Sequence, residues 1–218
     1  MPRDSGFCLP SSGIVRIVAG SVLLAALVSL APATIVGLNQ IVTPEIQPAG
    51  VMALSAQFQH PAIGNSAQLQ FELGLTPRFE LGWFQGFKPG EAFFDTELNL
   101  VQQGPHLLTA GLINWSTRDS AAQPVLEYGY YTDTDHFVGG GIYVNGHTEL
   151  LLGYKRQMSA EWQFSTDFQS GRGNSTTVGF TYNFSPRLSL NPALYWTNSS
   201  RHHFLGYVVL TYNLTVWK

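Results

Sequence analysis

From residue 51 to the end of the chain, apolar and polar side chains alternate with a period of two. In residues 67–75 (AQLQFELGL), every odd position is apolar and every even position is polar or glycine. Residues 162–169, 176–184 and 210–216 repeat this pattern. Successive side chains of a β-strand point to opposite faces, so each of these segments has one apolar and one polar surface. The pattern therefore predicts an all-β structure.

Turn-forming residues divide this region into about twelve strands. Alternation is weak around Leu107 and Phe137, so the expected range is 10 to 14 strands. An even number places both termini on one side of a barrel, together with the short proline turns at residues 76–78, 104–106 and 185–187. The strands are expected to begin near residues 51, 67, 79, 92, 107, 124, 137, 148, 162, 175, 187 and 204.

The first 50 residues lack this alternation. Arg3 and Arg16 precede an uncharged apolar run at residues 17–30, and Ala31-Pro32-Ala33 follows with the small-x-small pattern of a cleavage site. We expect a signal peptide at residues 1–33, whose removal would take away the only cysteine; the alternative is a permanent helical anchor, since about 20 apolar residues span a bilayer. Residues 34–50, with two prolines, are expected to be a periplasmic lead-in, and residues 51–218 the barrel.

Composition separates a membrane barrel from the other β-classes. Charged residues make up 11% of the chain, against about 25% in ordinary soluble domains. Hydrophobic residues make up 44%, which excludes disorder, while a mean hydropathy of +0.04 is too low for a bundle of membrane-spanning helices. A soluble sandwich would show exposed faces rich in Lys and Glu. The net charge of −3, without a basic patch, excludes nucleic-acid binding.

Aromatic residues gather near the ends of the expected strands, as in the interfacial girdles of membrane barrels. With the alternating strands and the C-terminal segment 210–217, they make residues 51–218 resemble a bacterial outer-membrane β-barrel protein. The resemblance implies an outer-membrane location among its lipids, and insertion by the barrel-assembly machinery, which reads a final aromatic residue; here Lys218 follows Trp217. The expected girdle residues are Trp83, Trp115, Tyr130, Tyr154, Trp162, Tyr182, Trp196 and Trp217.

If the apolar phase of the strands faces lipid, the polar phase faces the lumen. That phase carries seven acids and one base, a balance that favours cations in an aqueous pore. We therefore expect a narrow porin-like channel or transporter for small solutes or cations, although the acids would also suit a merely solvated lining. The expected lumen-lining residues are Glu72, Glu80, Asp95, Glu97, Glu127, Glu149, Lys155 and Asp167.

Two other functions stay open at this point. A barrel of about twelve strands can be filled by its own side chains, which would make it a non-conducting structural barrel. An outer-membrane lipid-modifying enzyme would need a serine activated by a histidine, but all six histidines lie outside the clear strands and no G-x-S-x-G motif occurs. We therefore expect no catalytic residues, no cofactor and no metal site.

Overall fold

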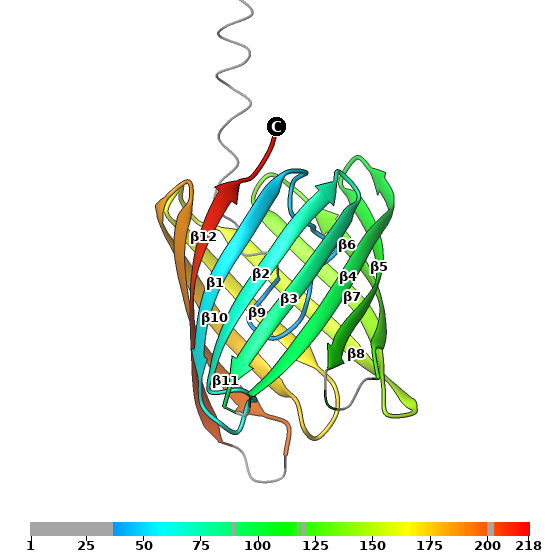
Figure 1. Cartoon of the computed structure of the whole chain (residues 1–218), viewed down its shortest axis with the longest axis vertical. Helices are drawn as coiled ribbons and strands as arrows, with labels where there is room; N and C mark the ends of the chain where they lie inside the picture. Colours follow the sequence, from blue (N-terminus) through cyan, green and yellow to red (C-terminus); the bar gives the residue numbers. More distant parts are fainter. Residues whose placement is uncertain (1–36, 89, 117, 119–120, 200–202) are drawn as a thin grey trace, which may run out of the picture. The chain divides into compact units, whose positions relative to one another are not determined.

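The computed structural model describes residues 37–218, except residues 89, 117, 119–120 and 200–202. In this part of the chain, twelve antiparallel strands form one closed barrel (Figure 1). The strands are β1 (Val51–Gln59), β2 (Ala67–Thr76), β3 (Phe79–Phe87), β4 (Gly90–Gln103), β5 (His106–Ser116), β6 (Gln123–Tyr131), β7 (Asp135–Val144), β8 (His147–Gln157), β9 (Trp162–Gln169), β10 (Ser175–Ser185), β11 (Leu188–Thr197) and β12 (Phe204–Thr215).

The predicted antiparallel barrel of about twelve strands is confirmed, and the strands begin close to the predicted positions. Each strand pairs with its neighbours in sequence, and β1 pairs with β12 from Val51↔Thr215 to Gln59↔Tyr207 to close the ring. Within the described residues, no helix is long and apolar enough to cross a membrane. The signal peptide predicted at residues 1–33 lies outside the described residues and stays a prediction.

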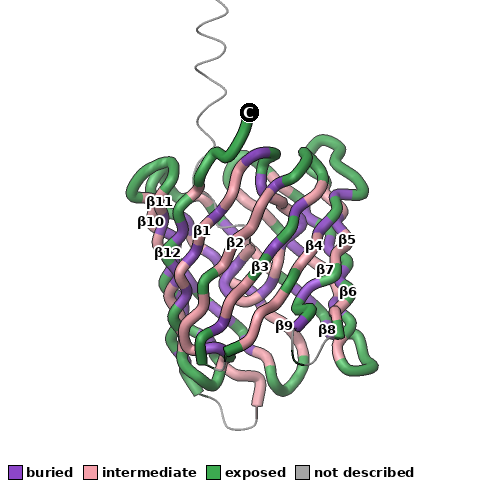
Figure 2. Tube along the Cα trace, viewed as in Figure 1, coloured by how far each residue is buried: buried purple, intermediate pink, exposed green. Residues whose placement is uncertain are grey.

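The outer surface of the barrel is apolar and its inner surface is largely polar. On β10, Thr177 and Thr181 are buried inside, whereas Val178 and Phe180 between them are exposed outside. The same alternation of buried and exposed positions runs along most strands (Figure 2). This is the reverse of a soluble protein, in which large apolar side chains point inward, and it is the arrangement found in barrels that stand in lipid.

Local sequence explains the irregular points of the barrel. Asn145 and Gly146 both have positive φ angles and form the two-residue turn between β7 and β8, as Asn-Gly pairs do in tight hairpins. Asn114 has a φ of 56° at a register shift between β4 and β5. Its backbone N–H donates a hydrogen bond of 2.7 Å to Asp95 Oδ1, so the Asp95 carboxylate stabilises this bulge.

Residues 37–50, which we call the plug segment, lie inside the barrel (Figure 1, blue). The segment turns at residues 38–41, where Leu38 N–H donates to Ile41 C=O at 3.0 Å. It joins β1 at Gly50, which has a φ of +77°. The Gly50 N–H donates a hydrogen bond to the Gly74 carbonyl of β2, which fixes the start of β1 in the wall. Residues 34–50 were distinguished from the strands in the sequence because they lack alternation. Their position inside the barrel was not predicted.

Candidate functional site

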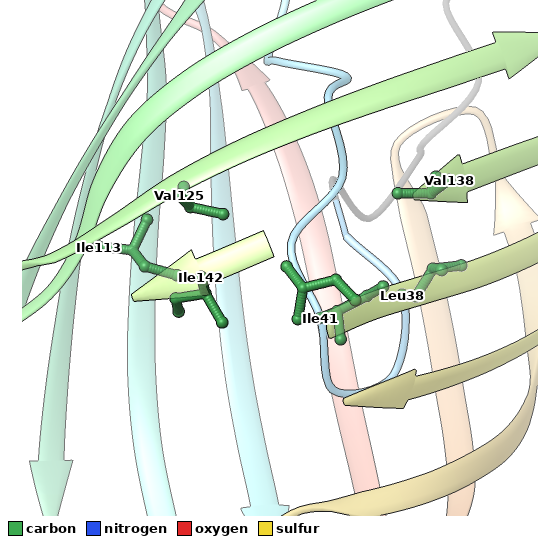
Figure 3. Packing of buried hydrophobic residues seen from close by; sticks show 7 residues of the cluster. Leu38, Ile41, Ile113, Val125, Val138 and Ile142 are labelled. Atoms are coloured by element: carbon green, nitrogen blue, oxygen red, sulfur yellow. The ribbon is translucent and has the colours of Figure 1, made fainter. Parts of the chain in front are cut away.

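The tip of the plug segment packs against an apolar part of the inner wall. Leu38 and Ile41 belong to one buried cluster with inward-facing side chains of β5, β6, β7 and β8 (Figure 3). Burying such a side chain stabilises a fold by about 1.5–3 kcal/mol. The interior is therefore partly apolar, whereas the sequence had suggested a polar interior throughout. The wall members of this cluster are Ile113, Val125, Val138, Ile142 and Leu151.

Asn39, at the same tip, is held by polar groups from the adjoining strands β9–β11. Its backbone N–H donates to Asp167 Oδ2 at 2.7 Å, and its side-chain amide donates to Thr177 Oγ1 at 2.9 Å. The Tyr195 hydroxyl donates to its backbone carbonyl. Both ends of its side chain are thus satisfied, as a buried amide requires. The wall residues bonded to Asn39 are Ser165, Asp167, Thr177, Asn191 and Tyr195.

An ion pair between the buried Lys155 and the partly exposed Glu45 holds the middle of the plug segment. The Lys155 ammonium on β8 donates to Glu45 Oε2, and His136 Nδ1 lies 3.2 Å from Glu45 Oε1. Burial by itself would raise the pKa of Glu45, but the Lys155 charge and the hydrogen bonds from His136 and Lys155 lower that pKa to about 2. Glu45 is therefore ionised at neutral pH, and the one base predicted to face the lumen is neutralised by the plug segment.

Glycines in the wall make room for the plug segment. A β-carbon at Gly153 would lie 2.2 Å from Leu38 Cδ1, and one at Gly179 would lie 2.2 Å from Asn39 Oδ1. A β-carbon at Gly74 would lie 2.3 Å from the Gln47 carbonyl oxygen. Such distances are well inside van der Waals contact, so a larger residue at these positions would not fit beside the segment.

The rest of the lumen contains a cavity of about 340 Å³. Residues 37–43 of the plug segment form part of its lining, and the wall contributes mainly from β1–β4. Its described lining holds four carboxylates and no Lys, Arg or His. Five glutamines, one of them Gln40 of the plug segment, add uncharged hydrogen-bonding groups. The lining acids are Glu72, Glu80, Asp95 and Glu97, and the glutamines of β1 and β2 are Gln57, Gln59, Gln68 and Gln70.

The other four predicted lumen residues lie away from this cavity. Lys155 and Asp167 bind the plug segment, as described above. Glu149 accepts hydrogen bonds of 2.7 Å from both Gln169 and Asn174. Glu127 is 1% exposed, and neither of its carboxylate oxygens has a hydrogen-bond partner among the described residues. The structure thus divides the eight charged residues between an open region and a filled one.

Most of the predicted girdle residues are exposed on the outside of the barrel. Most of them take part in aromatic pairs; for example, Trp83 stacks on Phe71 with ring centroids 5.1 Å apart, and the rings of Trp162 and the half-buried Tyr182 lie 4.8 Å apart. Tyr154 is also half-buried. Their position relative to the lipid interface stays a prediction. The exposed members are Trp83, Trp115, Tyr130, Trp162, Trp196 and Trp217.

A closed antiparallel barrel with an apolar exterior and polar interior is the fold of bacterial outer-membrane β-barrel proteins. The chain is similar in structure to the KdgM porin, with a TM-score of 0.54 and 10% identity over 74% of this chain and 98% of that chain. A second structure, the KdgM porin in complex with disordered oligogalacturonate, has a TM-score of 0.53 with the same identity and coverage.

The outer-membrane phospholipase A from Escherichia coli has a TM-score of 0.43 and 10% identity, over 84% of this chain and 100% of that chain. No protein-family model matches the sequence, and no curated protein matches it. At these identities the likeness to solved structures concerns the fold alone.

Proposed function

We propose that the protein is a narrow porin-like channel of the bacterial outer membrane that admits small solutes and prefers cations. The observation that carries this proposal is the cavity, whose described lining holds four carboxylates and no basic side chain. Carboxylates around a narrow aqueous space attract cations and repel anions. The neighbouring glutamines add donors and acceptors for uncharged polar solutes.

The same lining argues against one solute known from the similar structures. One KdgM structure is a complex with oligogalacturonate, which is a polyanion. Glu72, Glu80, Asp95 and Glu97 would repel such a molecule, because their like charges meet it at short range in a partly desolvated space. We therefore propose a different preference for this chain, within the same general class of small-solute channels.

In the proposed orientation, both termini face the periplasm and the cavity opens toward the outside. The β1–β2 connection supports this arrangement, because Ile63 and Asn65 line the cavity at the end of the barrel opposite to Gly50. The proposed partners are the lipids of the outer membrane, the barrel-assembly machinery and small solutes or cations. No described feature favours a lipid-modifying enzyme over this function.

Single-channel recording of the purified protein in planar bilayers tests the proposal. A salt gradient should give a reversal potential that indicates preference for K⁺ over Cl⁻. Glu97→Gln should lower this preference about two-fold, because one carboxylate of the lining loses its charge at a site partly screened by salt. Glu149→Gln is the matched control, since Glu149 is bonded to Gln169 and Asn174 outside the cavity. Anion preference, or no openings from any variant, would refute the channel.

A further inference from the structure

We propose that the inner wall carries a built binding site for residues 37–50, and that this plug segment binds there reversibly and closes the channel. The proposal goes beyond the channel function, although its conductance measurement rests on that function. The described cavity lining includes no residue of β6–β10, because the plug segment occupies that part of the lumen.

The wall matches the plug segment in shape and in chemistry. Gly153 and Gly179 leave the space that Leu38 and Asn39 fill. An apolar surface on β5–β8 receives Leu38 and Ile41, and polar groups on β9–β11 receive Asn39. Such agreement of size, polarity and charge along consecutive residues is what a specific peptide-binding surface shows.

A charged contact and two backbone contacts extend this match toward Gly50. Lys155 pairs with Glu45, which would otherwise be an uncompensated charge. Thr109 Oγ1 donates to the Pro44 carbonyl at 2.8 Å, and the Gln47 N–H donates to Glu80 Oε2. The site therefore recognises most of the length of the segment rather than its tip alone.

The barrel does not depend on the plug segment for its closure. The ring is completed by pairing β1 with β2 and β12 through residues 51–59, all of which follow the segment in sequence. Among the described residues, the backbone hydrogen bonds between the segment and the wall lie at its C-terminal end, where Val51 N–H donates to Pro48 C=O and Gly50 bonds to Gly74 and Val216. The segment can therefore leave as a unit while it stays attached at Gly50.

The closed state also buries a group that water would stabilise. Glu127 lies on β6 between Val125 and Gly129 and pairs with Gly140 of β7, so its carboxyl group sits beside the apolar cluster that the plug tip covers. It is buried without a hydrogen-bond partner among the described residues. A buried polar group without a partner is destabilising, and hydration on opening would remove that penalty. This opposes the contacts that hold the segment in place.

An engineered disulfide tests whether the segment must move. A β-carbon at Gly179 would lie 2.9 Å from Asn39 Cγ. Because the Cβ–Cγ bond of Asn39 is about 1.5 Å long, the β-carbons of residues 39 and 179 would be at most about 4.4 Å apart. This separation is within the reach of a disulfide. The full chain carrying Cys8→Ser, Asn39→Cys and Gly179→Cys should show few openings when oxidised. Reduction should restore the open fraction about tenfold or more. Equal conductance before and after reduction would overturn the proposal.

A space-filling substitution tests the same site from the opposite direction. Gly153→Leu places a side chain where Leu38 and Ile41 pack, whereas the nearest wall atom, Val138 Cβ, lies at an ordinary 3.5 Å. It should displace the segment and raise the open fraction. Gly139→Leu is the matched control, because Gly139 on the neighbouring strand β7 has nothing within 4 Å of its β-carbon position. Heat-modifiable migration on gels verifies that each barrel has folded. An unchanged open fraction in a folded Gly153→Leu protein would count against the binding site.

Thiol labelling separates failure of this proposal from failure of the channel function. Asn39→Cys, in the Cys8→Ser background, replaces a residue that is 4% exposed in the closed state. A bulky soluble maleimide should label position 39 in the folded protein, and faster when Gly153→Leu is added. If such labelling is found although no variant conducts, the reversible binding of the segment is supported and the channel function is refuted. If the label reacts only after denaturation, the segment is a permanent part of the barrel and the proposal is overturned.

Discussion

The two halves of the lumen use the same strand geometry for opposite purposes. On β1–β4 the inward positions are mostly glutamines and carboxylates, and they line the cavity. On β5–β8 many inward positions are Ile, Val or Leu, and they pack against the plug segment. The inward positions of β1–β4 that line the cavity are therefore mostly polar, whereas those of β5–β8 around Leu38 and Ile41 are apolar. The period-two pattern indicates which side chains share a face of the sheet. Whether that face lies against the cavity or against the plug tip is indicated only by the residue types.

The acids of the lumen also differ in whether backbone N–H groups are bonded to them, and among the cavity acids Glu80 and Asp95 accept such bonds from Gln47 and Asn114. Asp167 in the filled half accepts backbone N–H bonds from Asn39 and Gln40, so its charge is used to hold the plug segment. Glu72 and Glu97 in the open half line the cavity. A carboxylate that is already bonded to backbone donors contributes less to ion selectivity than one that faces the solute. Counting acids in the lumen therefore overstates its selectivity.

The largest expected effect concerns apolar packing in the filled half. Leu151 is 1% exposed and belongs to the cluster around Leu38 and Ile41. Leu151→Ala should lower the free energy of unfolding by about 2–5 kcal/mol, through lost burial and the cavity left behind. Gln68→Ala in the open half should change it by only about 0.5 kcal/mol. Denaturant titration of both variants in the same lipid measures the difference, and equal losses would refute the division of the lumen.

A smaller effect is expected from breaking the ion pair. Lys155→Met leaves the Glu45 carboxylate uncompensated, which should weaken docking of the plug segment by about 2 kcal/mol, less than for a fully buried pair because Glu45 is one-quarter exposed. Hydrogen–deuterium exchange at residues 38–47 should accelerate while the strands stay protected. Adding Glu45→Gln should recover part of the loss, because it removes the unpaired charge. Unchanged exchange in Lys155→Met would show that the pair does not hold the segment.

The smallest expected effect is a dependence on pH. The folded-state pKa of Glu45 is about 2, below its ordinary value of 4.5, so its ion pair contributes fully above pH 4.5. The contribution should be lost as the pH falls from 4.5 toward 2, and the open fraction should rise several-fold over that interval. His136, which faces the same carboxylate, is present in every variant compared. Glu45→Gln should remove this response, and an acid response that persists in Glu45→Gln would assign it to another group.

The strands could be predicted from the sequence because their signals are local. Alternation and turn residues act within ten positions, and they located all twelve strands. The plug segment could not be found in this way, since it has no periodicity and its contacts join residues more than a hundred positions apart, as between Asn39 and Asp167.

Two weak signals of the plug segment were nevertheless present in the sequence. Alternation faded around Leu107 and Phe137 because the strands there carry apolar side chains on both faces, one for the outside and one for the plug tip. Glycines also occupy inward positions at Gly74, Gly153 and Gly179, where the wall presents no side chain to the segment. Both departures mark places where another part of the chain approaches the wall closely.

The attachment at Gly50 has a consequence for the order of folding. Gly50 C=O accepts a hydrogen bond of 2.7 Å from Val216 N–H, so the tether of the plug segment sits at the seam where the first and last strands meet. Partners of the segment lie on strands as far apart as β3 and β11, and these face one another only after the ring is closed. The full set of partners for the segment therefore exists only once β1 has paired with β12, and we expect the segment to dock completely as the last step of folding.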